Sequence, residues 1–172
     1  PSLKDLRNRI SSVKSTKKIT SAMKMVAAAK LKRAQDNAEK SRPYANKMKD
    51  IVLSLISRSN TNNLKFSKSN NKKTVLLIVC SADRGLCGGF NGSIIKHAKN
   101  VTDTLRKNGK DFKFLFVGKK AYQSLKRLYN NLTIDLVSDF ANPRIEFSIA
   151  SSIRDQVLKL FFDNEISECY LI

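Results

Sequence analysis

The sequence is poor in the residues that mark several protein classes: it has no tryptophan, one histidine and three cysteines. The widely spaced Cys80, Cys87 and Cys169 suit free thiols in a reducing compartment better than a disulfide framework. No apolar run approaches the roughly 18 residues that a membrane-spanning helix needs, and the first residues lack the layout of a secretory signal. These absences predict a soluble intracellular protein.

Acidic residues are also scarce, and the positive charge is unevenly distributed. The 33 Lys and Arg outnumber the 14 Asp and Glu, which gives a formal net charge of +19. Residues 1–73 carry 19 basic against 4 acidic side chains, a net of +15, whereas residues 74–172 carry 14 against 10, a net of +4. A basic segment of this kind favours nucleic acid, an anionic membrane or an acidic protein as its partner. Composition alone favours nucleic acid.

The basic segment has the pattern of one long helix, from Leu3 to about Ile56. Ser2 and Asp5 are spaced to cap its first turn. An apolar seam of the coiled-coil kind begins with Leu3, Leu6, Ile10 and Val13. Its later positions are mostly small or charged, at Lys17, Thr20, Lys24, Ala27, Leu31, Ala34 and Ala38.

This helix is too long for a domain of the remaining size to cover. It spans on the order of 80 Å at about 1.5 Å per residue, whereas the rest of the chain would have a radius of gyration of about 13 Å. Most of its apolar side therefore needs a partner outside this sequence. The run Met23–Lys30 (MKMVAAAK) fits either an ordinary amphipathic helix with a solvated basic face or a surface that repacks against several partners.

Pro43 predicts a bend near Ser41, because proline removes one backbone hydrogen bond. Apolar spacing resumes after the proline, so the helix is expected to continue. The Ser-, Asn- and Lys-rich segment that follows predicts a flexible linker. We therefore expect a shaft helix over residues 1–58, a linker over 59–73 and a globular domain over 74–172.

The globular part alternates strands and helices, which predicts an α/β fold with a mostly parallel, Rossmann-like sheet and helices on both faces. The first strand is a nearly unbroken β-branched and apolar run (TVLLIVCS), typical of a strand buried on both faces. Strands are expected over residues 74–81, 112–117, 133–137 and 168–172. Helices are expected over about 92–108, 119–129 and 144–163.

These elements predict no catalytic constellation, cofactor site or metal site. The glycines of the turn ADRGLCGGFNG fit neither G-x-G-x-x-G nor a Walker motif, so they are interpreted as structural, permitting positive φ and close helix packing. Cys87 and His97 have no third group near them in sequence and are a poor basis for a nucleophile and its base. No metal-ligand spacing occurs. Asp83 and Arg84 are expected to pin the turn.

Two segments together resemble one protein family. The N-terminal stretch SLKDLRNRI..VKSTKKIT.AMKMVAAAK and the loop SADRGLCGGFN, which follows a first strand after a long helix, are similar to the γ subunit of F-type (rotary) ATP synthase. The similarity covers nearly the whole chain, including SRPYA at the expected bend. The bacterial and mitochondrial γ subunits fit best.

In that family, the N-terminal helix pairs with a C-terminal helix as an antiparallel coiled coil that turns inside the hexamer of α and β subunits. The resemblance implies a non-catalytic central-stalk rotor subunit that couples proton flow to ATP synthesis or hydrolysis. It also implies that the α/β domain contacts the ε subunit and the c-ring, so that the chain meets the membrane only through the complex. The expected location is the cytoplasmic face of a bacterial inner membrane or the matrix face of a mitochondrial inner membrane.

The resemblance also implies a subunit interface on the long helix. The part that faces the β subunits matches Met23, Lys24, Met25 and Val26. Lys30 and Arg33 are candidates to meet the acidic lever segment of those subunits. Exposed ion pairs of about 0.2 to 1 kcal/mol each can be exchanged during rotation without trapping it.

Two points stay open at the level of sequence. The C-terminal helix of the family is absent after Ile172, so we expect either a longer chain or a second chain that supplies it. The alternative function is a basic nucleic-acid-binding protein with an α/β domain. Against it, the basic helix has almost no interleaved aromatic residues and comes with no recognisable binding module.

Overall fold

The computed structural model describes residues 2–58, 73–140 and 145–172. The chain divides into two compact units, one ending at Ser67 and the other beginning at Lys68. This division falls within the segment predicted to be a linker, of which residues 59–72 lie outside the described residues. The first unit contains a single long helix and the second an α/β sheet.

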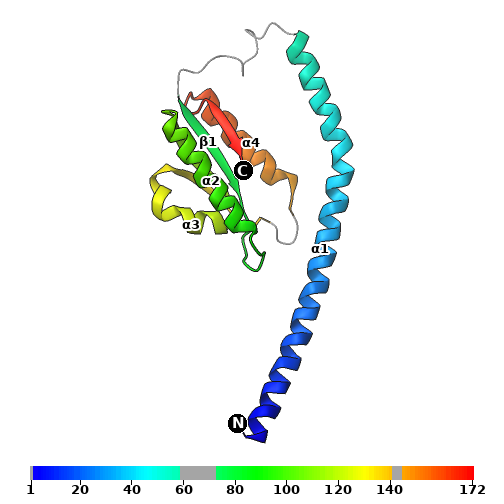
Figure 1. Ribbon diagram of the computed structural model, residues 1–172. Helices are drawn as coiled ribbons and strands as arrows, with labels where there is room; N and C mark the ends of the chain where they lie inside the picture. The colour runs from blue at the N-terminus through cyan, green and yellow to red at the C-terminus, as the bar shows by residue number, and fades with distance from the viewer. Residues whose placement is uncertain (1, 59–72, 141–144) are drawn as a thin grey trace. The chain divides into compact units, whose positions relative to one another are not determined.

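The first unit is built on α1 (Leu3–Arg58), a helix of 56 residues that Figure 1 shows as one gently bowed rod. Its N-terminus has the predicted capping box: the Asp5 amide donates to Ser2 Oγ at 3.3 Å, and the Ser2 amide donates to an Asp5 carboxylate oxygen at 3.1 Å. The helix runs through Pro43 without a break. The proline is thus accommodated inside one helix, which ends close to the predicted residue.

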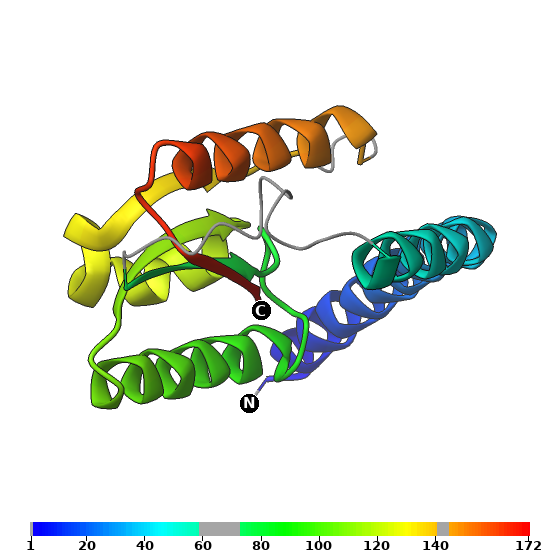
Figure 2. The same ribbon diagram turned by 90° about the horizontal axis from the view of Figure 1, so that it is seen from above.

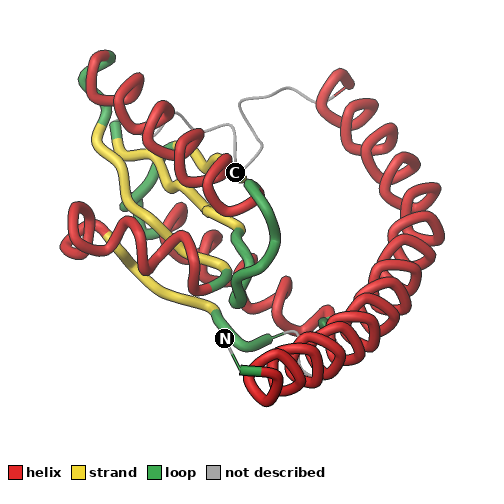
Figure 3. The backbone as a smooth tube through the Cα atoms, turned by 60° about the horizontal axis from the view of Figure 1, so that its bottom comes forward, coloured by secondary structure: helices red, strands yellow, loops and turns green. Residues whose placement is uncertain are grey.

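The second unit is a parallel sheet with helices on both faces (Figure 3). Its strand order is β3-β2-β1-β4, and all three neighbouring pairs are parallel, which confirms the predicted Rossmann-like α/β class. The elements in chain order are β1 (Thr74–Cys80), α2 (Phe90–Lys107), β2 (Asp111–Val117), α3 (Lys119–Tyr129), η2 (Asn130–Leu132), β3 (Thr133–Val137), α4 (Phe147–Phe162) and β4 (Glu168–Leu171).

The predicted strands and helices of this unit are all present, with shifts at some ends. Helix α2 begins at Phe90 instead of Gly92, because the Ser93 amide already donates to the Gly89 carbonyl at 2.9 Å and closes a first turn. Helix α4 begins at Phe147, whereas its predicted start at residue 144 lies outside the described residues. The shifts leave the topology unchanged.

The core lies on both faces of the two central strands, β1 and β2. Helices α2 and α3 cover one face and α4 covers the other, as Figure 2 shows. The face under α2 and α3 buries Val75, Leu77, Val79, Phe112, Phe114 and Phe116. The face under α4 buries Leu76, Ile78, Leu115 and Val117. Burial on both faces explains why β1 is continuously apolar instead of alternating.

The end of α2 follows from its C-terminal glycine, as predicted. Gly109 has a φ of +65°, a left-handed conformation that glycine adopts without a Cβ penalty. The Gly109 amide donates to the Arg106 carbonyl at 3.0 Å, and the Lys110 amide donates to the Leu105 carbonyl at 2.9 Å. This pair of bonds is a Schellman motif, which turns the chain directly into β2.

Candidate subunit interface

Along the described helix α1, no side chain is buried. The first seam residues, Leu3, Leu6, Ile10 and Val13, are 76%, 43%, 55% and 67% exposed. Helices in proteins gain most of their stability from packing an apolar face, and large exposed apolar patches mark interaction sites. The seam of α1 is therefore a surface suited to a partner.

The six candidate interface residues do not share one side of α1. Successive residues of an α-helix turn by about 100°, so spacings of three and four keep side chains on one side. One side carries Met23, Val26, Lys30 and Arg33. Lys24 falls in the apolar seam, and Met25 lies roughly opposite Met23. The continuous helix thus separates the residues into three surfaces.

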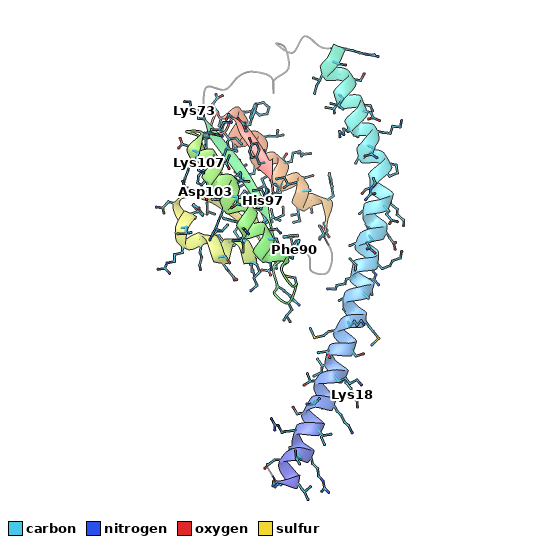
Figure 4. All side chains as sticks on the ribbon, in the orientation of Figure 1. Lys18, Lys73, Phe90, His97, Asp103 and Lys107 are labelled. Carbon is cyan, nitrogen blue, oxygen red and sulfur yellow. The ribbon has the colours of Figure 1, made fainter. Side chains whose placement is uncertain are left out.

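The charge on α1 is strongly positive, with 15 Lys and Arg against 4 Asp and Glu. The described helix shows one ion pair, in which Lys32 Nζ lies 2.9 Å from an Asp36 carboxylate oxygen. The other basic side chains extend from the helix, as Figure 4 shows for Lys18. The positive charge makes this helix complementary to an acidic partner surface. In residues 2–58, 73–140 and 145–172, no helix is both long and apolar enough to cross a membrane.

The Gly-rich turn after β1 is held at the carboxyl ends of three strands. One carboxylate oxygen of Asp83 accepts a hydrogen bond from the Lys119 amide at 3.0 Å, and the other accepts one from the Asp139 amide at 2.9 Å. Lys119 follows β2 and Asp139 follows β3, so a single side chain links both to the turn. The prediction that Asp83 pins the turn is confirmed.

Lys119 and Asp139 also form an ion pair with each other, in which Lys119 Nζ lies 2.5 Å from an Asp139 carboxylate oxygen. The hydrogen bond from Lys119 lowers the pKa of Asp139 from its ordinary value, against a smaller opposing effect of desolvation. Arg84 contributes only a weaker attraction that lowers the Asp139 pKa further. Arg84 therefore contributes less than Asp83 and Lys119 to holding the turn.

Sequence reasoning missed two further side chains that fix the turn. Ser81 Oγ accepts from the Ala121 amide at 3.0 Å and donates to the Gly118 carbonyl at 3.2 Å. Asn91 Oδ1 accepts from the Ala82 amide at 3.0 Å. Their positions, directly after β1 and in the first turn of α2, could have indicated this role, because Ser and Asn side chains at such positions often form hydrogen bonds with nearby backbone groups.

The glycines of the turn have a narrower role than predicted. Gly88 has a φ of +58°, but Gly85, Gly89 and Gly92 have no positive φ. Among the described residues, no atom lies within 4 Å of a Cβ built on Gly88, Gly89 or Gly92. The prediction that these glycines permit close helix packing is therefore wrong, since α2 approaches the sheet farther along, through buried side chains such as Ala98 and Leu105.

Cys87 and His97 have separate surroundings. Cys87 Sγ accepts a hydrogen bond from Asn91 Nδ2 at 2.9 Å. His97 lies farther along α2 (Figure 4) and lines a groove of about 350 Å³ with Lys110 and Tyr170. Because their neighbours differ, Cys87 and His97 do not form a nucleophile–base pair. Within the described ranges, no group of three or more His, Cys, Asp and Glu is placed to hold a metal ion.

Comparison with known proteins identifies the family. A family model described as ATP synthase matches residues 2–172. This chain belongs to the ATP synthase family. Its curated relatives include ATP synthase gamma chains of Beijerinckia indica (47% identical over 99% of this chain), Pelagibacter ubique (45% over 97%) and Sinorhizobium medicae (44% over 99%). The predicted resemblance to the γ subunit is confirmed.

The similarity extends to a solved structure. The central stalk and c-ring structure of Tetrahymena thermophila mitochondrial ATP synthase contains a chain that matches 81% of this chain and 58% of its own length, with 30% identity and a TM-score of 0.63. The present chain spans 59%, 58% and 60% of the lengths of the three curated relatives. The long helix followed by a parallel α/β domain is thus a fold found in the central stalk and c-ring structure of a mitochondrial ATP synthase.

Proposed function

We propose that this chain is a non-catalytic central-stalk rotor subunit of F-type ATP synthase, which couples proton flow to ATP synthesis or hydrolysis. The single observation that supports this most strongly is a 56-residue helix with no buried side chain in a chain that the ATP synthase family matches over residues 2–172. A helix of this kind is suited to transmit motion to partners that surround it. The nucleic-acid-binding alternative has no support from the relatives and is not retained.

The proposed partners of α1 are the α and β subunits. The stripe of Met23, Val26, Lys30 and Arg33 would face the β subunits, and the two basic residues would meet acidic side chains there. Lys24 and Met25, which the resemblance also placed at this interface, lie on other sides of α1 and are not included in this face. Met23 and Val26 are 54% and 58% exposed and are free to make such contacts. Because exposed ion pairs contribute only about 0.2 to 1 kcal/mol each, these contacts can be exchanged as the helix turns.

The proposed partners of the α/β domain are the ε subunit and the c-ring. Residues 59–73 would join this foot to the shaft helix over residues 1–58. The location would be peripheral, on the cytoplasmic face of a bacterial inner membrane or the matrix face of a mitochondrial inner membrane, with membrane contact only through the complex. The similarity to a chain of a central stalk and c-ring structure supports this arrangement.

Disulfide trapping in the assembled complex tests the proposal. The native cysteines Cys80, Cys87 and Cys169 are first replaced by serine in the full-length chain, and Met23→Cys is introduced. A cysteine scanned through the acidic segment of the β subunit should crosslink to position 23 on oxidation. The crosslink should stop ATP hydrolysis, and reduction should restore it. Failure of the full-length chain to assemble with α and β subunits would overturn the proposal.

A further inference from the structure

The carboxyl edge of a Rossmann-like parallel sheet is where such domains usually bind anionic ligands, often at a helix N-terminus. In this chain the corresponding donors at the start of α3 are already used. The Lys119 amide is directed at one Asp83 oxygen, and the Ala121 amide is directed at Ser81 Oγ. The Asp139 amide and the Lys119 ammonium complete a cluster of donors around two carboxylates.

We propose that Asp83 is a positioning residue that occupies this anion position from within the chain and holds the loop over residues 82–89 in one conformation. Its carboxylate replaces the ligand that a Rossmann-like edge would otherwise bind. This inference concerns the loop and goes beyond the rotor function proposed above, on which it does not depend.

The loop needs such a restraint because its own sequence provides little. It contains three glycines, Gly85, Gly88 and Gly89, and glycine has the largest backbone freedom of any residue. Its tip, Leu86, is 98% exposed and has a φ of 63°, which is unfavourable for a residue with a Cβ. A leucine held in this conformation without contacts of its own is fixed by the anchors on either side.

Those anchors are placed at both ends of the loop. Asp83 ties the start of the loop to the ends of β2 and β3, and Asn91 ties its end by accepting from the Ala82 amide at 3.0 Å and donating to Cys87 Sγ at 2.9 Å. The Asp83 bonds are charge-assisted and join segments that are far apart in sequence. Removing the carboxylate should therefore release the loop more than any other single change in it.

Hydrogen exchange measured by mass spectrometry on the assembled complex tests the proposal. In Asp83→Ala, the Lys119 and Asp139 amides lose their charge-assisted acceptor and should exchange about tenfold faster or more. The Ala82 and Phe90 amides, which donate to Asn91 Oδ1 and to the Cys87 carbonyl at the two ends of the loop, should also exchange faster as the loop is released. Amides of β1 and β2 should be unchanged. The matched control is Asp103→Ala, an exposed aspartate on α2 (Figure 4), which should alter none of these rates.

Rescue by added formate distinguishes the loss of a carboxylate at the anion position from a general loss of structure in Asp83→Ala. Formate can enter the space left by the Asp83→Ala side chain and offer both oxygens to the same donors. Sodium formate should slow loop exchange in this variant relative to sodium chloride at equal ionic strength, with no effect on the unsubstituted protein. Exchange that rises equally across the whole sheet, or that does not respond to formate, would overturn the proposal.

Asp83→Asn provides the same test if the alanine variant does not assemble. The amide group keeps the shape of the side chain but offers one acceptor oxygen where the carboxylate offers two. Exchange should rise at either the Lys119 or the Asp139 amide and at the Ala82 and Phe90 amides. Unchanged exchange at all of these amides would show that the carboxylate does not hold the loop.

Discussion

The backbone of Gly118 lies directly against that of Ser81: a Cβ built on Gly118 would stand 1.9 Å from the Ser81 carbonyl oxygen. Gly118 also has a φ of +96°, in a region that residues with a Cβ rarely adopt. The Ser81 amide donates to the Val117 carbonyl at 2.7 Å, and the Gly118 amide donates to the Val137 carbonyl at 2.8 Å. A glycine is therefore required where the ends of β1, β2 and β3 meet.

Gly118→Ala should destabilise the chain by about 3 kcal/mol or more, because backbone strain and a backbone collision act together. Urea denaturation followed by circular dichroism measures the loss. The matched control is Gly109→Ala, where φ is +65° but no described atom lies within 4 Å of the new Cβ, so only about 1 to 2 kcal/mol should be lost. Equal losses in the two variants would show that the close approach is unimportant.

Leu125→Ala should leave a cavity between α3 and the sheet and cost about 2 to 5 kcal/mol of unfolding free energy. Leu125 has no exposed surface, whereas Leu128 on the same helix is 62% exposed. Leu128→Ala should therefore change stability by less than about 0.5 kcal/mol. A comparable loss in both variants would contradict the packing of α3 described above.

Because of Glu168, the stability of the α/β domain should decrease as the pH falls in the acid range. Hydrogen bonds from Lys110 and then Tyr170 lower the pKa of Glu168 from its ordinary value. A carboxylate with a lowered folded-state pKa contributes stability above its unfolded pKa, about 4.3 for glutamate, and loses it as pH falls through the folded value. Glu168→Gln should therefore have a lower urea midpoint than the unsubstituted protein at pH 7, with a difference that shrinks as the pH falls below about 4.

Two controls define the Glu168 experiment. Lys110→Met removes the main hydrogen-bond partner of Glu168, so the difference between its urea midpoint and that of the unsubstituted protein should likewise shrink as the pH falls. Asp103→Asn should have the same urea midpoint as the unsubstituted protein at every pH. High salt should reduce the difference in urea midpoint between Glu168→Gln and the unsubstituted protein, because the ion pair of Lys110 and Glu168 is partly exposed. A constant difference between Glu168→Gln and the unsubstituted protein from pH 7 to pH 3 would rule out the pKa shift.

Met23→Lys should impair coupling more than folding, because it adds a charge to the stripe proposed to face the β subunits. The measurement is ATP-driven proton transport divided by ATP hydrolysis in membranes that contain the full-length variant. Met25→Lys is the matched control, since Met25 is similarly exposed, at 65% against 54%, but lies roughly on the opposite side of α1. Unchanged coupling in Met23→Lys, or an equal loss in both variants, would contradict the assigned face.

The sequence by itself determined the elements and their order. The capping residues Ser2 and Asp5, the unbroken apolar run of β1 and the stop at Gly109 are local signals, and each was read correctly because its physical cause lies within a few residues. The family resemblance followed from the same stretches of sequence and was confirmed over residues 2–172. The unpartnered seam of α1 was predictable too, since its length alone exceeds what a small domain can cover.

Only the tertiary structure decided how the Gly-rich turn is held and which glycine is indispensable. Asp83 lies 36 residues from Lys119 and 56 from Asp139 in sequence, so no local pattern shows that one carboxylate joins all three. The turn glycines looked like packing residues, yet the close backbone contact falls at Gly118, in a different loop. Parallel strands bring distant carboxyl ends to one edge, and contacts made there depend on sheet order and register, which the sequence pattern does not specify.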